Sequence, residues 1–298
     1  MRKSKYGVRI KWVVGFALLL SVTGVLAWYL VSGQSMSIQS NQLEQDSHLI
    51  QAVVENNIEK VRSLLEEEAS LNVQMDEGFS VLTYSIKSNY VEIATLLIES
   101  GADLNEIVFE GNTLLMEAAY VGNDVLVSLL IEKGLDSNQA NDYGWTPLHA
   151  SISTGSQSVL SLLLEAGADI NAADEDGWTP FMEALYYDYD DISNYLLQNG
   201  ADIHAVESNN RSPLMIAAMA SNNENILEKL LSLGADLNLQ DQDGKTALMW
   251  AVEFGHEENV QYLVDAGADQ TLQTTEGSTA LDLAKATSNI SILAILEQ

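Results

Sequence analysis

The sequence predicts an all-α fold, a solenoid in which helix-turn-helix units are stacked and joined by β-hairpin loops. Three observations support this prediction: two rows of glycines and one row of prolines all repeat every 33 residues. The rows are Gly78, Gly111, Gly144, Gly177, Gly244 and Gly277; Gly101, Gly134, Gly167, Gly200, Gly234 and Gly267; and Pro147, Pro180 and Pro213. A repeat of this length indicates stacked units that share one apolar core. Asn210 takes the slot of a missing glycine, and one residue is inserted between Asn210 and Gly234.

The first helix of each unit is predicted from its cap. Each proline follows a hydroxyl residue, which gives a side-chain N-cap before a proline at N1, where the missing N–H costs nothing. The cap residues are Ser80, Thr113, Thr146, Thr179, Ser212, Thr246 and Thr279. The helix ends at Gly122, Gly155 or Gly255, and Asn56, Asn89 or Asp188 stands at the same place in other units. Asn and Asp best tolerate the left-handed conformation of this position, so we expect the same turn there.

The second helix and the hairpin complete the unit. Residues 159–166 show leucines at helical spacing and close on Gly167-Ala168-Asp169. Small alanines on the first helices, such as Ala118, Ala217 and Ala251, predict close packing between helices.

Two segments of the third unit carry a resemblance to a known family. Residues 142–149 (Asp-Tyr-Gly-Trp-Thr-Pro-Leu-His) and 165–171 (Glu-Ala-Gly-Ala-Asp-Ile-Asn) resemble the ankyrin repeat consensus. The pattern recurs in about six full units, starting near Glu77, Glu110, Tyr143, Asp176, Asn209 and Asp243, with degenerate units at about 45–76 and 276–298. The resemblance covers residues 45–298. It implies a curved ankyrin repeat domain whose concave face binds another protein, with no catalysis and no cofactor.

The segment before the repeats predicts a membrane anchor. Residues 1–11 hold five of the 13 basic residues, and residues 12–31 carry no charge. Twenty helical residues rise roughly 30 Å, the thickness of the hydrocarbon core. Trp12, Trp28 and Tyr29 stand at the ends of this segment, where aromatic residues favour the membrane interface. We therefore expect a single transmembrane signal anchor with residues 1–11 in the cytoplasm and the repeats in the periplasm or outside the cell.

A cleaved signal peptide is the alternative interpretation of residues 1–31, because Ala27 and Gly33 end segments that resemble cleavage sites. Cleavage would leave a soluble periplasmic or secreted protein. Residues 32–44 are polar and uncharged up to Glu44, which predicts a flexible linker. Export of such repeats favours a bacterial ankyrin protein, by analogy with the family.

Charge excludes one class of partner. Residues 12–298 hold eight basic and all 43 acidic residues, a formal charge of −35. Nucleic-acid binders neutralise phosphates with Lys and Arg, so this chain is not one of them. Anionic lipid would also repel it, so we expect membrane contact through the N-terminal helix only.

Catalytic patterns are absent from the sequence. There is no cysteine, and none of the four histidines lies in a triad or a metal-binding motif. His149 belongs to the Thr-Pro-Leu-His motif, which in the family bonds backbone groups of neighbouring units. Asp188, Asp190 and Asp191 are candidates for a calcium ion, although the ligand spacing of an EF-hand is missing. We expect a non-enzymatic protein without a bound metal.

The partner-binding residues are predicted from the repeat positions that the family exposes, namely the hairpin tips and the ends of the first helices. Aromatic side chains and one arginine fill them: Phe79, Tyr120, Tyr143, Trp145, Trp178, Tyr186, Tyr187, Arg211 and Phe254. Trp, Tyr and Arg dominate the energetics of protein interfaces. We therefore expect an exported module that binds a partner protein. The alternatives are a periplasmic factor that supports an enzyme or binds divalent metal, and a secreted effector that acts on host proteins.

Overall fold

The computed structural model describes residues 35–75, 78–220 and 224–297. The chain divides into two compact units after Val73. In the first unit, α2 (Ser35–Val54) packs against α3 (Ile58–Glu66). Leu49, Val53 and Leu64 are buried in this unit. It contains the helix pair of the degenerate unit predicted at residues 45–76.

The linker predicted at residues 32–44 is wrong for most of its length, because α2 already begins at Ser35. No proline or glycine follows Gly33 in this segment. Extending an existing helix costs little once its first turns are formed, so polar residues can lengthen a helix that Leu49 and Val53 anchor. The predicted cytoplasmic segment at residues 1–11 and anchor at residues 12–31 lie outside the described residues. Within the described ranges, no helix has the length and apolar character needed to cross a membrane.

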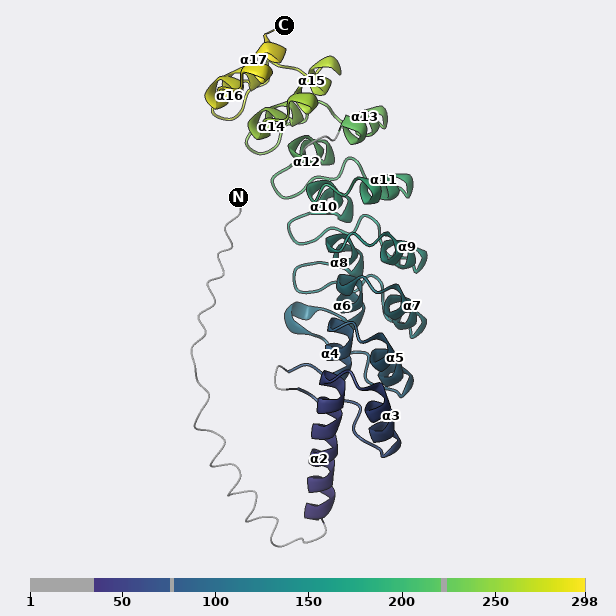
Figure 1. Cartoon of the computed structure of the whole chain (residues 1–298). Helices are drawn as coiled ribbons and strands as arrows, with labels where there is room; N and C mark the ends of the chain where they lie inside the picture. The colour runs from purple at the N-terminus through teal and green to yellow at the C-terminus, as the bar shows by residue number, and fades with distance from the viewer. Residues whose placement is uncertain (1–34, 76–77, 221–223, 298) are drawn as a thin grey trace, which may run out of the picture. The chain divides into compact units, whose positions relative to one another are not determined.

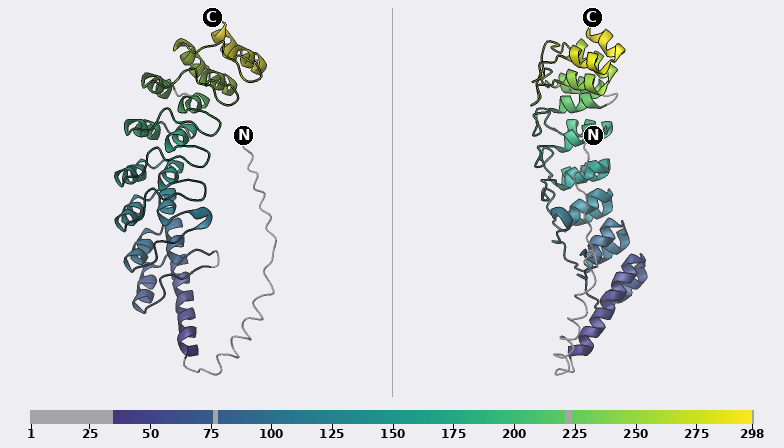
Figure 2. Two further views of the ribbon diagram at one scale, coloured as in Figure 1. Left: turned by 180° about the vertical axis from the view of Figure 1, so that it is seen from behind. Right: turned by 90° about the vertical axis from the view of Figure 1, so that its left-hand side faces the viewer.

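The second unit contains two rows of helices (Figure 1). The first row comprises α4 (Val81–Lys87), α6 (Leu114–Val121), α8 (Pro147–Ser153), α10 (Pro180–Tyr186), α12 (Pro213–Met219), α14 (Ala247–Phe254) and α16 (Ala280–Thr287). The second row comprises α5 (Val91–Glu99), α7 (Asp124–Glu132), α9 (Gln157–Glu165), α11 (Asp190–Gln198), α13 (Glu224–Ser232), α15 (Glu257–Asp265) and α17 (Ile290–Leu296). The loops that connect each second-row helix to the next first-row helix lie together on one side of the first row (Figure 2). The all-α helix-turn-helix solenoid is thus confirmed.

The predicted caps and turns are present. The hydroxyl of Thr113 accepts from Met116 N at 3.2 Å, and Thr179 does the same for Met182 N at 3.3 Å. The first helices end in a left-handed residue where the sequence predicts one, with φ of 51° at Asn56, 57° at Asn89 and 59° at Asp188. The cap residue and the left-handed residue therefore fix where these helices begin and end.

The hairpins are closed and linked by backbone hydrogen bonds. Asn141 N donates to Trp145 O at 2.8 Å within one hairpin, and Glu175 N donates to Tyr143 O of the previous hairpin at 2.9 Å. In the described residues these loops contain only isolated bridges, between Gln74 and Ser80 and between Ile107 and Thr113. A short 3₁₀ turn, η1 (Phe109–Gly111), widens one loop. The links between hairpins hold the tips of adjacent repeats in register.

The core lies between the two rows. Leu97, Leu130 and Leu163 of the second row are fully buried, as are Ala118 and Ala217 of the first row. Because alanine has no side chain beyond Cβ, the first-row helices pack closely. In α8, α10 and α12 only the last residue escapes burial. The C-terminal ends of the first-row helices, together with the hairpin tips, hold the predicted binding residues.

Candidate functional site

Most of the predicted binding residues fall on one surface, made by the hairpin tips and the exposed ends of the first-row helices. Contacts between rings and charged groups connect most of them into a continuous line. We call this surface the aromatic face, and its members are Phe79, Tyr120, Trp145, Trp178, Tyr186, Tyr187, Trp250 and Phe254.

One end of the aromatic face is organised by an ion pair. Lys87 Nζ lies 2.7 Å from Glu117 Oε2 and 5.4 Å from the centre of the Phe79 ring. Asn112 Nδ2 also donates to Glu117, at 3.1 Å. Lys87, Glu117 and Tyr120 line a hollow of about 370 Å³. The lysine therefore bridges the aromatic side chain of one repeat and the carboxylate of the next.

The centre of the face contains two tryptophans joined by one carboxylate. Trp145 Nε1 donates to Asp174 Oδ2 at 3.2 Å, and the backbone N–H of Trp178 donates to Asp174 Oδ1 at 2.7 Å. The Tyr120 ring lies 6.4 Å from the Trp145 ring, centre to centre. Burial raises the pKa of the Tyr120 hydroxyl, and the nearby Glu183, Glu117 and Glu110 raise it further. This tyrosine is thus neutral and sits in an acidic environment.

His149 connects the two repeats at this centre, as the family resemblance implies. The backbone N–H of Thr146 donates to its Nδ1 at 3.1 Å, so Nε2 carries the proton and donates to the Trp178 carbonyl at 3.2 Å. Burial lowers the pKa of this imidazole. His149 therefore links two repeats structurally.

Three tyrosines extend the centre along the end of α10. Tyr186 meets Trp178 edge to face, with ring centres 5.6 Å apart, and Tyr187 lies 5.5 Å from Tyr186. Tyr189 continues the series at 5.8 Å from Tyr187. Tyr186 is 63% exposed. Exposing an aromatic side chain to water is unfavourable. The exposed Tyr186 therefore indicates that this surface binds another molecule.

The far end of the face includes a tryptophan that sequence reasoning missed. Arg211 lies 6.0 Å from the Trp178 ring and 5.9 Å from the Trp250 ring, and both Glu207 oxygens accept from its guanidinium. Lys245 Nζ is 4.1 Å from the Trp250 ring centre. Phe254 is 6.1 Å from Trp250. Trp250 could have been found from its repeat position. It is the fourth residue after its cap, as Glu117 and Glu183 are in their repeats.

Two predicted features lie apart from this line. Tyr143, at a hairpin tip, donates its hydroxyl to Glu110 of the previous hairpin at 3.3 Å. Asp188, Asp190 and Asp191 lie at the turn before α11, and in the described part of the chain no three acidic or histidine side chains are placed to share a metal ion. Burial raises the pKa of Asp190, and Asp188 and Asp191 raise it further. The calcium alternative gains no support from this geometry.

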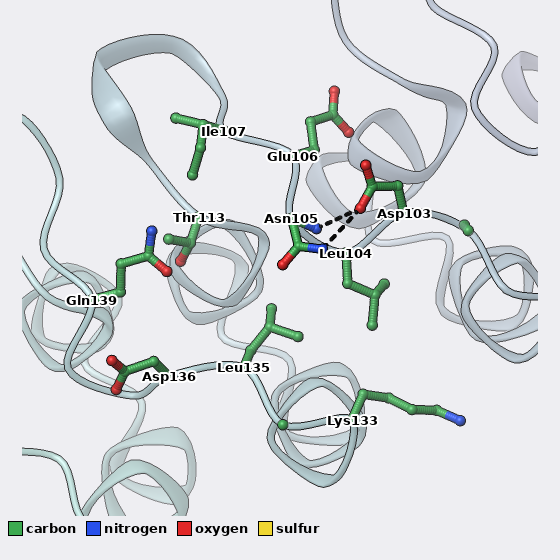
Figure 3. Close-up of a pocket in the computed structure, with 12 residues that line it drawn as sticks. Asp103, Leu104, Asn105, Glu106, Ile107, Thr113, Lys133, Leu135, Asp136 and Gln139 are labelled. Atoms are coloured by element: carbon green, nitrogen blue, oxygen red, sulfur yellow. Dashed lines mark hydrogen bonds between the residues drawn. The ribbon is translucent and has the colours of Figure 1, made fainter.

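A pocket of about 530 Å³ lies between two loops outside the aromatic face (Figure 3). Leu104 and Leu135 line it, together with several polar side chains. Two of its carboxylates already have structural partners: Asp103 accepts from Asn105 N at 3.0 Å, and Glu106 accepts from Ser80 N at 2.9 Å and Thr83 Oγ1 at 2.6 Å. None of the predicted binding residues lines this pocket, so we do not place the site there.

Comparisons with known proteins agree with this geometry. A family model described as ankyrin repeats (3 copies) matches residues 21–108, 115–207 and 214–297, and one described as ankyrin repeats (many copies) matches residues 184–231. The chain is also similar to the crystal structure of the human ASB11 ankyrin repeat domain, with a TM-score of 0.65 and 27% sequence identity. That match covers 72% of this chain and 96% of the other. Ankyrin repeats are typically non-enzymatic scaffolds for protein–protein interaction. The chain belongs to the ankyrin repeat family.

Proposed function

We propose that the aromatic face binds a partner protein and that this binding is the function of the chain. The main support for this proposal is the continuous line of half-buried and exposed rings from Phe79 to Phe254, which charged groups hold in place. Each ring lies against another ring or a charged group of its own or an adjacent repeat, so little entropy is lost when a partner docks. Indole and phenol rings on a preformed surface are the side chains that contribute most to interface affinity.

The test of this proposal substitutes four aromatic side chains at the centre of the aromatic face. Replacing Trp145, Trp178, Tyr186 and Tyr187 together with Ala should abolish capture of a crosslinked partner while leaving helical circular dichroism unchanged. The matched control replaces Tyr195 and Tyr262, tyrosines of the second-row helices α11 and α15, with Ala. A partner captured equally by the wild type and the control, and then confirmed with the purified proteins, supports the proposal. Equal capture by the quadruple variant would refute it.

We also propose that the repeats are exported and that residues 12–31 anchor them. The support is the uncharged segment of twenty residues after a basic N-terminus and the strongly acidic remainder of the chain. After alkaline carbonate extraction, the full chain should remain with the membrane and keep Met1. A soluble product that lacks Met1 would favour the cleaved, periplasmic or secreted form instead.

A further inference from the structure

Glu183 is a mostly buried residue whose carboxyl oxygens still reach solvent and have no protein partner in the described residues. It lies in α10, at the centre of the aromatic face, and only 6% of its surface is exposed. No cation or hydrogen-bond donor pairs with its side chain in the described residues, and Asp174 lies close enough to disfavour its ionised form. Removing most of a carboxyl group from water without a cation or a hydrogen-bond donor costs free energy of folding. A partner that supplied such a group would recover part of that cost.

Another repeat shows which kind of group pairs with a carboxylate at this repeat position. Glu117 stands four residues after its cap, as Glu183 does, and it is equally buried. A lysine of the previous repeat, Lys87, approaches it to 2.7 Å. Ser153 occupies the place of Lys87 in the repeat before Glu183, and its hydroxyl donates to Ala150 O at 2.7 Å. The carboxylate is therefore present in both repeats, but the lysine is present only in the first.

The surroundings of Glu183 suit a cation that arrives from outside. When ionised, it raises the pKa of the Tyr120 and Tyr187 hydroxyls, so both side chains lie near it. Ring faces attract ammonium groups. Arg211, the cationic side chain at the next hairpin, is already held by Glu207 at 3.0 Å.

We propose that Glu183 and Asp174, framed by the rings of the aromatic face, receive the ammonium group of a lysine side chain of the partner protein. This inference rests on the proposed function and names the chemistry that the partner presents. An unmodified lysine is favoured because the Lys87–Glu117 pair shows a primary ammonium in direct contact with a carboxylate at this position.

The acid–base behaviour of the face makes the inference testable by pH. Burial, with Asp174 close by, raises the pKa of Glu183 to about 8. Besides Asp174, the titratable groups that interact with it are Tyr120 on α6 and Tyr187, the residue that follows α10. Both tyrosines have a raised pKa and are neutral at pH 7. An ammonium group stabilises the ionised carboxylate, so binding releases a proton. Affinity should therefore rise from pH 6 toward pH 8, by up to about tenfold per unit, and then level off.

The experiment selects 12-residue peptides from a random display library on the purified full chain. We expect enriched peptides to carry a lysine next to apolar residues and to lose binding to the Trp145→Ala, Trp178→Ala variant. Enrichment that depends on the tryptophans but contains no preferred lysine would overturn this inference and leave the proposed function standing. Failure to enrich any peptide that depends on the tryptophans would contradict both.

A double-mutant cycle then measures the contact. Replacing the peptide lysine with norleucine should weaken binding to the wild type by at least about tenfold, but by less than about twofold in Glu183→Gln. Glu183→Ala serves as a second variant, since Ala150 fills this position in the previous repeat. Glu165→Gln removes the same charge from α9 and should behave as the wild type does. An equal loss in wild type and Glu183→Gln, or a pH-independent affinity in the wild type, would overturn the inference.

Discussion

At the residue scale, two glycines from different rows, Gly144 and Gly167, have different surroundings although both have positive φ. At Gly144, φ is 80°, and an added Cβ would lie 2.8 Å from Glu175 N and 3.0 Å from Asp174 Cα. At Gly167, φ is 87°, and an added Cβ would meet nothing within 4 Å. Gly144 is thus required by both conformation and space, and Gly167 by conformation alone.

This difference predicts unequal effects of one substitution. Gly167→Ala should lower the free energy of unfolding by about 1–2 kcal/mol, the cost of a left-handed conformation for an L-residue. Gly144→Ala should cost about 1–3 kcal/mol more, because backbone atoms of the next hairpin must move. Urea unfolding of the two variants measures the difference. Equal destabilisation would show that the hairpins are not held in close contact.

Asn210 shows how one residue replaces a glycine of the first row. It keeps the left-handed conformation, with φ of 63°, and its Nδ2 donates to Gln240 O at 2.8 Å. The asparagine thus adds a hydrogen bond to the next hairpin in place of the close contact that glycine allows.

At the element scale, α12 ends differently from its neighbours and α15 compensates for it. Its C-cap, Ala220, is extended rather than left-handed. The carbonyls of this end are satisfied from the next repeat: His256 Nε2 lies 2.8 Å from Met219 O, and Asn259 Nδ2 donates to Ala220 O at 2.8 Å and Ala218 O at 3.3 Å. The one-residue insertion predicted between Asn210 and Gly234 lies in the same repeat, near residues outside the described ranges.

Asn259 occupies a position that is otherwise apolar. The equivalent residues of the other second helices are Ile93, Leu126, Val159, Ile192, Ile226 and Ile292. Asn259 itself is fully buried, although it is polar. Its Nδ2 serves the end of α12, while its Oδ1 has no partner in the described residues.

We expect Asn259→Leu to destabilise the protein although it restores the apolar pattern. The substitution leaves the carbonyls of Ala218 and Ala220 without this donor, at a cost of about 1–3 kcal/mol. Leucine is also larger than asparagine at a fully buried site, so overpacking offsets its gain in apolar burial. Chemical unfolding of Asn259→Leu and of the conservative core control Ile226→Leu provides the comparison. A more stable Asn259→Leu variant would show that these bonds contribute nothing.

At the scale of the whole molecule, negative charge is spread over the repeats with few compensating cations. The described residues contain three ion pairs, Lys87–Glu117, Arg211–Glu207 and Lys245–Glu253, and all three lie along the aromatic face. The sequence pI is about 4.1. At neutral pH, repulsion between carboxylates opposes the compact state.

Salt should therefore stabilise the folded chain. Raising NaCl from about 10 mM to 500 mM shortens the Debye length from about 30 Å to less than 8 Å and screens this repulsion. The thermal unfolding midpoint should rise by several degrees over this range, measured by circular dichroism at pH 7.5. An unchanged or lower midpoint would mean that repulsion is not a significant term.

Sequence reasoning predicted the repeats, the caps and most of the face. Tyr120, Trp145, Trp178, Tyr186 and Tyr187 lie where their repeat positions place them, because the units are stacked with a constant register. It missed the helix of residues 35–44, since polar residues without a cap carry no helix signal. It also missed Trp250, whose position in the unit is apolar in several other repeats.

The sequence by itself determined the 33-residue unit, the ends of its helices and the left-handed turns, because each depends on a residue's own backbone preference or on neighbours within four positions. Only the tertiary structure decided which charges are paired. Lys87 meets Glu117 across 30 residues of sequence, whereas Glu183 meets no cation in the described residues and lies near Asp174. Such contacts depend on how adjacent repeats superpose, which no local pattern specifies.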